Sequence, residues 1–312
     1  IVKIGIIGTG FRGQNHIDIL LNRQDVVIVA FADPDEKMLA AAQNLLKKAG
    51  RAAAIEYKNG NEDYKNLLKR TDIDAVIIAT PWEWHTPMAV YAMESGKHAA
   101  VEVPAARTLE ECWQLVETSE STKKHCMQLE NCCYDFFELM TLKMAREGFF
   151  GDVVHVEGAY IHDLVWLNFD KDKGYQGMWR LEENFRNGNL YPTHGLGPIC
   201  QILNINRGDQ MDYLTSLSSN DFQMQKKAKE LAQQDSFWNG YAEKSYRGNM
   251  NTTVVKTKLG KSIVIQHDVT SPRPYSRLHV VSGTEGYAQK YPEQKVAKGH
   301  SWMKEEEMKA LR

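Results

Sequence analysis

Gly8-Thr9-Gly10-Phe11-Arg12-Gly13 is the stretch that decides the fold of this chain. A strand-like run, Val2 to Ile7, comes directly before it, and an amphipathic stretch, Gln14 to Leu21, follows. A second β-type run, Val26 to Ala32, ends just before Asp33. Asp33 lies at about the twenty-residue spacing from Gly13 that the dinucleotide-binding fingerprint requires. This order of strand, glycine turn, helix and acidic residue predicts an α/β nucleotide-binding domain.

Each residue of the fingerprint has a physical role. Gly8 permits a tight turn, Gly10 lets the backbone approach a pyrophosphate, and Gly13 lets the helix pack closely on the strand. The N-terminus of that helix faces the phosphate charge. Asp33 is placed to hydrogen-bond ribose hydroxyls and to repel a 2′-phosphate, which favours NAD over NADP. The alternative is a glycine turn that binds no ligand.

Composition narrows the class of protein. The chain has 312 residues, enough for two domains, and its formal charge of −2 gives no electrostatic reason to expect nucleic acid or a membrane surface as partner. Its five cysteines form no disulfide framework, and no ligand spacing indicates a metal site. No apolar run has the length of a membrane span. The chain begins inside the first strand, and we expect it to be truncated at both ends.

Strand and helix signals alternate through residues 1–131, which we expect to form the first domain. Apolar runs predict strands at 73–79, 98–102 and 126–131, and helices are expected at 36–49, 86–95 and 109–122. This alternation predicts a doubly wound parallel sheet, the Rossmann arrangement, with its ligand at the carboxyl ends of the strands.

The pattern changes in residues 132–312, the expected second domain. An alternating strand, 153–160, precedes an aromatic loop over 164–189 that includes Tyr175, and a helix is expected from about Pro192 to Asn204. Four further runs have the signals of antiparallel strands: 213–217, 252–258, 262–267 and 278–282. We therefore predict an α+β substrate-binding domain with an open, mostly antiparallel sheet covered on one face by helices.

Two motifs at strand ends allow a comparison with a known family. Ala79-Thr80-Pro81 is followed by His85, and Glu102-Val103-Pro104 follows the next strand. With the glycine fingerprint and the sheet domain, this arrangement resembles the glucose-fructose oxidoreductase/inositol dehydrogenase (Gfo/Idh/MocA) family. That family usually has E-K-P, whose lysine assists proton transfer. Val103 replaces the lysine here, which argues against ordinary sugar dehydrogenation.

Further motifs resemble one branch, glycoside hydrolase family 109, whose members are NAD-dependent α-N-acetylgalactosaminidases. They are Trp82-Glu83-Trp84-His85, Glu102-Val103-Pro104-Ala105-Ala106, Glu130-Asn131-Cys132-Cys133-Tyr134, Gly188-Asn189-Leu190-Tyr191-Pro192-Thr193-His194-Gly195 and Arg273-Pro274-Tyr275-Ser276. The resemblance implies hydrolysis by transient oxidation of the sugar at C3. Loss of the C2 proton then expels the leaving group, water adds, and the hydride returns to C3, an exception to the two-carboxylate scheme.

The fingerprint and the resemblance together name the residues that bind NAD. They are Gly8, Gly10, Phe11, Arg12, Gly13, Asp33, Trp82, Glu83, Trp84, His85, Glu102, Val103, Asn131 and Tyr191. Glu102 and Asn131 are expected at the ends of two neighbouring strands. For Trp82 and Trp84, packing between the domains is the alternative.

The resemblance also names residues on the substrate side. His194, Tyr191 and Tyr275 are expected to be catalytic, and His194 is the group we expect at the C3 hydroxyl, because histidine accepts protons near neutral pH. Arg180 would orient the sugar. The alternatives are a structural histidine at 194 and core packing at Tyr160. The substrate-binding set is Tyr160, Arg180, Tyr191, Pro192, Thr193, His194 and Tyr275.

Two other functions remain open, namely a net NAD-dependent sugar oxidoreductase and a non-catalytic sugar or nucleotide sensor. The substrate is expected to be a small sugar or glycan, although galactosamine and glucosamine differ only at C4. The family resemblance also suggests a homodimer and a bacterial periplasmic or secreted location.

Overall fold

A computed structural model describes residues 1–171 and 178–311. The chain divides into two compact units, Ile1–Leu129 and Glu130–Arg312. Tyr175, which belongs to the expected aromatic loop, lies outside the described residues.

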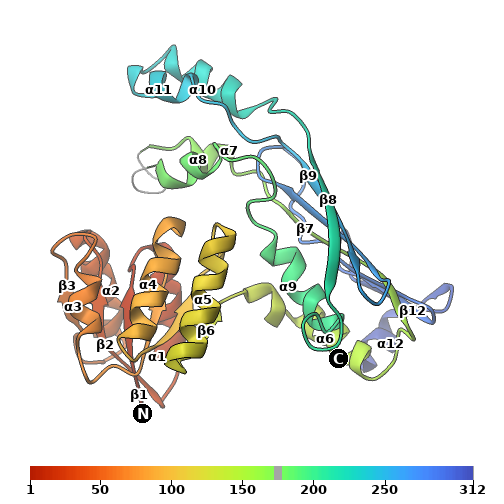
Figure 1. The fold of residues 1–312 in the computed structure, drawn as a ribbon, viewed down its shortest axis with the longest axis horizontal. Helices are drawn as coiled ribbons and strands as arrows, with labels where there is room; N and C mark the ends of the chain where they lie inside the picture. The colour runs from red at the N-terminus through yellow and green to blue at the C-terminus, as the bar shows by residue number, and fades with distance from the viewer. Residues whose placement is uncertain (172–177, 312) are drawn as a thin grey trace. The chain divides into compact units, whose positions relative to one another are not determined.

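The first unit is built on a six-stranded sheet in the order β3-β2-β1-β4-β5-β6 (Figure 1). All neighbouring strands are parallel. β1 lies at the switch point, between β2 and β4, so the loop after β1 opens at the carboxyl edge where doubly wound folds bind ligands. The doubly wound prediction is therefore confirmed. The strands are β1 (Val2–Ile7), β2 (Val26–Ala32), β3 (Ile55–Tyr57), β4 (Ala75–Ile78), β5 (His98–Val101) and β6 (Cys126–Gln128).

The helices of this unit are α1 (Phe11–Leu21), α2 (Glu36–Lys48), α3 (Tyr64–Leu68), α4 (Trp82–Glu94) and α5 (Leu109–Thr122). Two begin at side-chain caps: Asp35 accepts from the Lys37 amide and Thr108 from the Glu111 amide. α4 begins at Trp82, four residues before the expected start at Thr86. The sequence 82–85 is therefore the first turn of a helix that starts right after Pro81, although no polar cap residue marks it.

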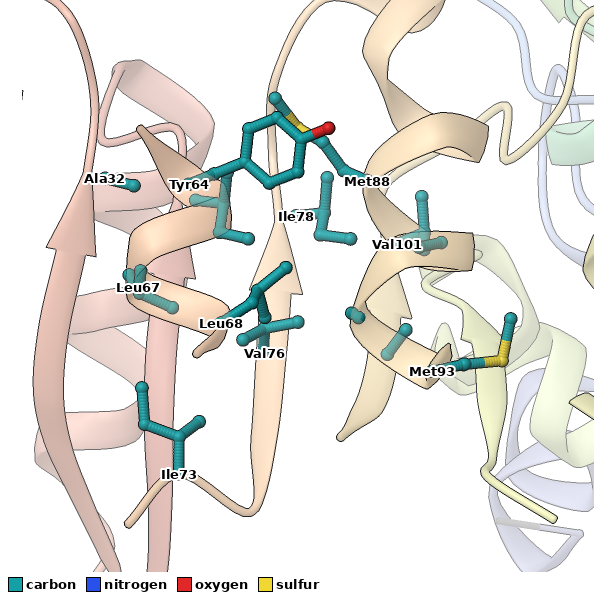
Figure 2. Close-up of a cluster of buried hydrophobic side chains, with 14 of the residues drawn as sticks. Ala32, Tyr64, Leu67, Leu68, Ile73, Val76, Ile78, Met88, Met93 and Val101 are labelled. Atoms are coloured by element: carbon teal, nitrogen blue, oxygen red, sulfur yellow. The ribbon is translucent and has the colours of Figure 1, made fainter. Parts of the chain in front are cut away.

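The first unit has two clusters of buried apolar side chains, one of which fills the space between the sheet and helices α3 and α4 (Figure 2). Val76 and Ile78 of β4 and Val101 of β5 are fully buried, and they pack with Leu67 and Leu68 of α3. Because both faces of a parallel sheet are covered, its central strands contain continuous apolar runs. This is why β4 was recognisable in the sequence.

The second unit contains an eight-stranded sheet in the order β14-β13-β12-β11-β7-β10-β9-β8. Only β7 and β10 pair in parallel, and the remaining described pairs are antiparallel. The prediction of a mostly antiparallel sheet is confirmed. Its strands are β7 (Val153–Ile161), β8 (Met211–Ser218), β9 (Asn251–Thr257), β10 (Ser262–Asp268), β11 (His279–Gly283), β12 (Gly286–Gln289), β13 (Lys295–Lys298) and β14 (Ser301–Trp302).

Helices α6 (Phe136–Arg146), α9 (Thr193–Ile202) and α12 (Glu305–Ala310) pack apolar side chains against this sheet. A separate apolar cluster joins α7 (Val165–Asn168), α8 (Trp179–Glu183), α10 (Met224–Ala232), η3 (Ser236–Trp238) and α11 (Asn239–Ala242). In Figure 1 these helices lie at the end of the sheet opposite α6 and α12. No described helix has the length and apolar character required to cross a bilayer.

Two glycines allow α9 to lie directly on β7. A Cβ on Gly158 would lie 2.5 Å from the Gly195 carbonyl oxygen, and a Cβ on Gly195 would lie 2.7 Å from the Ala159 amide nitrogen. Both distances are shorter than real Cβ contacts, so only glycine permits this approach. The approach places His194, the residue before Gly195, next to Tyr160 on β7.

Candidate functional site

In the glycine turn of the first unit, other backbone atoms lie close to Gly8 and Gly13, whereas Gly10 faces open space. Gly8 has φ +87°, and a Cβ there would lie 2.6 Å from the Ala79 carbonyl oxygen. A Cβ on Gly13 would lie 2.0 Å from the Gly8 carbonyl oxygen. A Cβ on Gly10 would meet no heavy atom within 4 Å. No side chain covers the backbone at Gly10, which faces open space. A pyrophosphate can therefore approach the backbone amides there.

Asp33 follows β2 and braces this turn. Its Oδ2 accepts from the Thr9 amide at 2.7 Å and from the Thr9 hydroxyl at 3.1 Å, while Oδ1 accepts from the Asp35 amide at 2.9 Å. A carboxylate has further lone pairs, which remain for ribose hydroxyls. Its charge opposes a 2′-phosphate at the same place. Phe11, by contrast, is 81 % exposed at the start of α1.

Glu102 follows β5 and is tied to α1. Its Oε1 lies 2.7 Å from His16 Nε2 and 3.7 Å from Arg12 Nε. Burial raises the pKa of Glu102, but the contacts with His16 and Arg12 outweigh it and leave the pKa below its usual value. Glu102 is therefore an anion at neutral pH. The adjacent Val103 is buried and brings no charge to this position.

In the first turn of α4, some side chains are buried in the core and others are exposed. His85 is buried, and its ring nitrogens lie 2.7 Å from the Pro104 carbonyl oxygen and 2.8 Å from the Thr80 carbonyl oxygen. It thereby joins the segments that follow β4 and β5. Trp82 is also buried, Trp84 is half-buried against the core, and Glu83 is exposed.

These residues of the first unit fit an NAD molecule, because the bare backbone at Gly10, the N-terminus of α1 and the Asp33 carboxylate each match one part of a dinucleotide. Asn131 is placed differently from our expectation. β6 ends at Gln128, and Asn131 is the exposed first residue of the short helix η1 (Asn131–Tyr134) in the second unit. The Glu130 side chain caps η1 by accepting from the Cys132 amide, so the strand does not continue to Asn131.

In the second unit the structure brings together Tyr160, Tyr191 and His194. The three rings lie edge to face or tilted, with centroids 4.7–5.3 Å apart. Each of these residues is less than a tenth exposed. Such a cluster offers apolar ring faces for a sugar and one imidazole for proton transfer.

A buried carboxylate holds His194. Glu130 Oε1 lies 2.7 Å from His194 Nδ1 and accepts from the Cys132 amide at 2.9 Å. Burial raises the pKa of Glu130, but the hydrogen bond and charge of His194 prevail, and the pKa lies below its usual value. An ionised Glu130 keeps the Nδ1 proton of His194 in place, so Nε2 is the ring nitrogen that can exchange a proton with a ligand.

Tyr275 joins this cluster through two residues that the sequence analysis did not assign. His162 Nδ1 lies 2.9 Å from the Tyr160 hydroxyl, and its ring meets Tyr275 edge to face at 4.9 Å. Arg277 lies over both tyrosine rings, 5.8 Å from Tyr160 and 5.7 Å from Tyr275. Burial raises the pKa of Tyr275 to about 12, although Arg277 opposes the shift, so its phenol keeps its proton at neutral pH.

The remaining predicted substrate residues are close by. The Arg180 guanidinium of α8 lies 5.8 Å from the centre of the Tyr191 ring. Pro192 caps α9 and Thr193 is its first residue, and both are half-buried. The structure therefore gathers every substrate residue of the prediction within the second unit.

Glu130, Cys132 and His194 also offer ligand atoms within 4.8 Å of one another. We assign no ion to this group. Arg277 donates to the Cys132 sulfur at 2.7 Å, and burial raises the pKa of the Cys132 thiol far above its usual value. A cation there would compete with a guanidinium for a protonated thiol, and zinc requires the thiolate.

Sequence reasoning did not assign four residues of this cluster. They are Glu130, His162, Arg277 and His267, whose ring stacks on that of Tyr160 with centroids 5.9 Å apart. Glu130 directly precedes Asn131 inside a quoted motif, and Arg277 is two residues from Tyr275, the period at which extended residues share a face. His267 alternates with Ile263 and Ile265 in a strand. The sequence did contain a signal for His267, because a titratable residue on the apolar face of an alternating strand is unusual and suggests a specific role.

The doubly wound first unit with its glycine turn defines a dinucleotide-binding protein, and comparison with known proteins extends this to a carbohydrate-acting family. Residues 134–310 match the family described as "Glycosyl hydrolase 109, C-terminal domain", and residues 2–129 match "Oxidoreductase family, NAD-binding Rossmann fold". The chain belongs to glycosyl hydrolase family 109 and has an NAD-binding N-terminal domain of the Gfo/Idh/MocA type.

Two relatives show how close the similarity is. The chain is 51% identical to an "Alpha-N-acetylgalactosaminidase" of Bacteroides fragilis over 95% of this chain and 70% of the relative. It is 47% identical to a "Glycosyl hydrolase family 109 protein" of Shewanella baltica over 94% of this chain and 63% of that protein.

Solved structures share the fold at low identity. A myo-inositol 2-dehydrogenase from Lactobacillus plantarum superposes with a TM-score of 0.70 and 18% identity, covering 99% of this chain and 85% of that chain. A scyllo-inositol dehydrogenase from Lactobacillus casei, solved with bound NAD(H) and scyllo-inositol, has a TM-score of 0.68 and 16% identity, covering 97% and 81%.

Proposed function

We propose that this protein hydrolyses terminal α-linked N-acetylgalactosaminides and that its NAD is regenerated within each catalytic cycle. The observation that carries the proposal is the buried Glu130–His194 pair beside Tyr160 and Tyr191, in a chain with an NAD turn and with Val103 in place of a lysine. The relative named α-N-acetylgalactosaminidase supports the choice of sugar.

Bound NAD⁺ supplies a hydride acceptor for a sugar carbon and, once reduced, a hydride donor. The protein must move the protons. His194 is the proposed base at the sugar C3 hydroxyl, since Glu130 fixes its Nδ1 and leaves the exchange to Nε2. An anionic Glu130 also stabilises the imidazolium that forms when His194 takes the proton.

Tyr275 and Tyr191 are the proposed partners for the other steps. Because burial raises its pKa to about 12, Tyr275 starts as a proton donor at neutral pH and suits a hydroxyl or leaving-group oxygen. Tyr191 lies between His194 and the Arg180 guanidinium, where it can contact the sugar. Arg180 orients the substrate with planar hydrogen bonds.

A nitrophenyl α-N-acetylgalactosaminide assay in heavy water tests the proposal. We expect release of nitrophenol, entry of deuterium at C2 of the freed sugar and no accumulation of NADH. Absence of release by protein that carries NAD contradicts the proposal. NADH formation from NAD⁺ and a free sugar would instead support the sugar oxidoreductase, and sugar binding without any turnover would support the sensor.

The proposal also covers the assembly and the location of the protein. We propose a homodimer because β8 and β9 expose large apolar side chains, including Tyr213, Leu217 and Val254. Light scattering at several protein concentrations tests it. We propose a periplasmic or secreted location on the family resemblance alone, and fractionation of producing cells tests that.

A further inference from the structure

His267 is a buried histidine next to the sugar-contacting residues. On β10 it is paired in register with Tyr160 on β7, and the two rings stack at 5.9 Å with an interplanar angle of 11°. The Tyr191 ring is 6.4 Å away. The His267 imidazole therefore lies directly beside two rings that we expect to contact the sugar.

Arg247 determines which ring nitrogen of His267 has the proton. Arg247 is fully buried, and its Nη1 lies 3.0 Å from His267 Nδ1 while Nη2 donates to the His267 carbonyl oxygen at 3.2 Å. A guanidinium can only donate, so Nδ1 must accept with its lone pair. Burial and the charge of Arg247 both lower the pKa of His267, which keeps the ring neutral. The single ring proton is therefore on Nε2.

That Nε2–H donor has no acceptor among the described residues, although the atom is buried. Buried donors without acceptors are rare in folded proteins because water cannot compensate them. Arg247 is itself held by its backbone amide, which donates to the Asn184 carbonyl at the end of α8 at 2.8 Å. Asn184 therefore fixes the backbone of Arg247, and Arg247 in turn fixes the His267 imidazole. The Nε2–H donor lies beside the residues that we expect to contact the sugar.

We propose that the Nε2–H of His267 donates a hydrogen bond to the acetamido carbonyl oxygen of the substrate and so selects N-acetylated sugars. This inference rests on the proposed function. Sugar hydroxyls both donate and accept, whereas a carbonyl oxygen only accepts. A neutral imidazole whose other nitrogen is occupied by a guanidinium offers only a donor, and the acetamido carbonyl is its matching partner.

Two substitutions separate this role from a structural one. In His267→Gln the side-chain amide reaches the position of Nε2 and keeps a donor there, while in His267→Asn the shorter amide keeps an acceptor for Arg247 and loses that donor. We compare kcat/KM on the nitrophenyl α-glycosides of N-acetylgalactosamine and galactose. We expect H267N to lose roughly 10- to 100-fold on the N-acetylated substrate alone. H267Q should keep most of the preference.

If H267N keeps its kcat/KM on the N-acetylated substrate and H267Q loses it, the proposal is overturned. The role of His267 is then to accept the hydrogen bond of Arg247. Equal losses on both substrates overturn it as well. If the wild type leaves the galactoside uncleaved, binding of the two free sugars replaces the rates. Melting temperatures of both variants show whether a loss merely reflects unfolding.

An NMR measurement tests the donor without turnover. In wild-type protein with ¹⁵N-labelled histidine, loaded with NAD, we expect His267 as the Nε2–H tautomer, assigned by its absence in H267N. N-acetylgalactosamine should shift its Nε2–H resonance and galactose should not. An Nδ1–H tautomer, or no shift at saturation, overturns the inference. Cleavage without this shift overturns only this inference, whereas failure to bind N-acetylgalactosamine contradicts the proposed function too.

Discussion

Glu130 and His194 show how a single buried carboxylate fixes which ring nitrogen of a histidine has the proton. The pair is buried, and the pKa of Glu130 stays below its usual value despite that burial. The two residues are 64 positions apart, so no local pattern links them. His194 could be predicted from its motif, but its partner could not, because their contact exists only after α9 packs beside η1. The same holds for Arg247 and His267, which meet across 20 positions.

Glu130→Gln is expected to lower kcat by roughly 10- to 100-fold, the range of one acid–base contribution, and to leave KM nearly unchanged. The neutral amide can still accept from Nδ1 but no longer stabilises the imidazolium. The acid limb of the pH–rate profile should therefore move to lower pH. Glu147→Gln, at an exposed carboxylate after α6, is the control. An unchanged kcat would show that His194 works without this anion.

The same pair predicts a pH dependence of stability. Because the pKa of Glu130 is lower in the folded protein, its ionisation stabilises the fold above its unfolded pKa of about 4.3, and this contribution disappears as the pH falls through the folded value. The melting temperature of wild type should exceed that of Glu130→Gln at pH 7, and the gap should close as the pH falls below the unfolded pKa and through the lower folded one. A gap that persists or widens in acid contradicts the assignment.

At the scale of elements, the sequence predicted best where an apolar run or a cap is explicit. β1, β2 and α5 have the bounds that we expected. α4 begins four residues before the start that we expected, at Trp82. The sequence did not reveal this start because no polar cap residue precedes Trp82-Glu83-Trp84-His85. Helices α6 and α10 and the short strands β12 to β14 were not anticipated, because they are defined by packing on the sheet or on other helices.

Two glycines in the first turn should give opposite results on substitution. Gly13→Ala is expected to cost about 1–3 kcal/mol of folding stability, because its Cβ collides with the Gly8 carbonyl oxygen. Gly10→Ala, with nothing within 4 Å and an ordinary φ of −64°, should fold as stably as wild type. It should nevertheless bind NAD more weakly, since a methyl group enters the pyrophosphate cradle. Thermal denaturation and NAD titration of both variants measure these effects.

Gly195→Ala tests the contact between α9 and β7. The added Cβ would lie 2.7 Å from the Ala159 amide nitrogen, so the helix must move away from the strand. We expect lower stability by about 1–3 kcal/mol and a larger loss of kcat than of NAD affinity. Gly240→Ala in α11, where a Cβ meets nothing, is the matched control. Full activity in Gly195→Ala would show that the position of His194 does not depend on this contact.

At the scale of the whole molecule, the chain has two compact units, and we propose that the first binds the cofactor and the second binds the sugar. NAD should bind the folded first unit and stabilise it by about 2.7 kcal/mol at 100 times its dissociation constant. Because Asp33 opposes a 2′-phosphate, NADP should give a much smaller shift of the melting temperature. Calorimetry with each dinucleotide measures this. Equal shifts would show that Asp33 does not discriminate. Purified protein is also expected to retain NAD, as an internally recycled cofactor should.

The glycine contact between α9 and β7 also bears on attempts to change which sugar is accepted. Because backbone touches backbone there, Tyr191 and His194 have a fixed height above the sheet. Arg180 sits on the short helix α8, which packs through side chains instead. A library of variants aimed at new glycosides should therefore change residues of α8 and its neighbours. It should keep Gly158 and Gly195, because their contact fixes the position of α9 on β7.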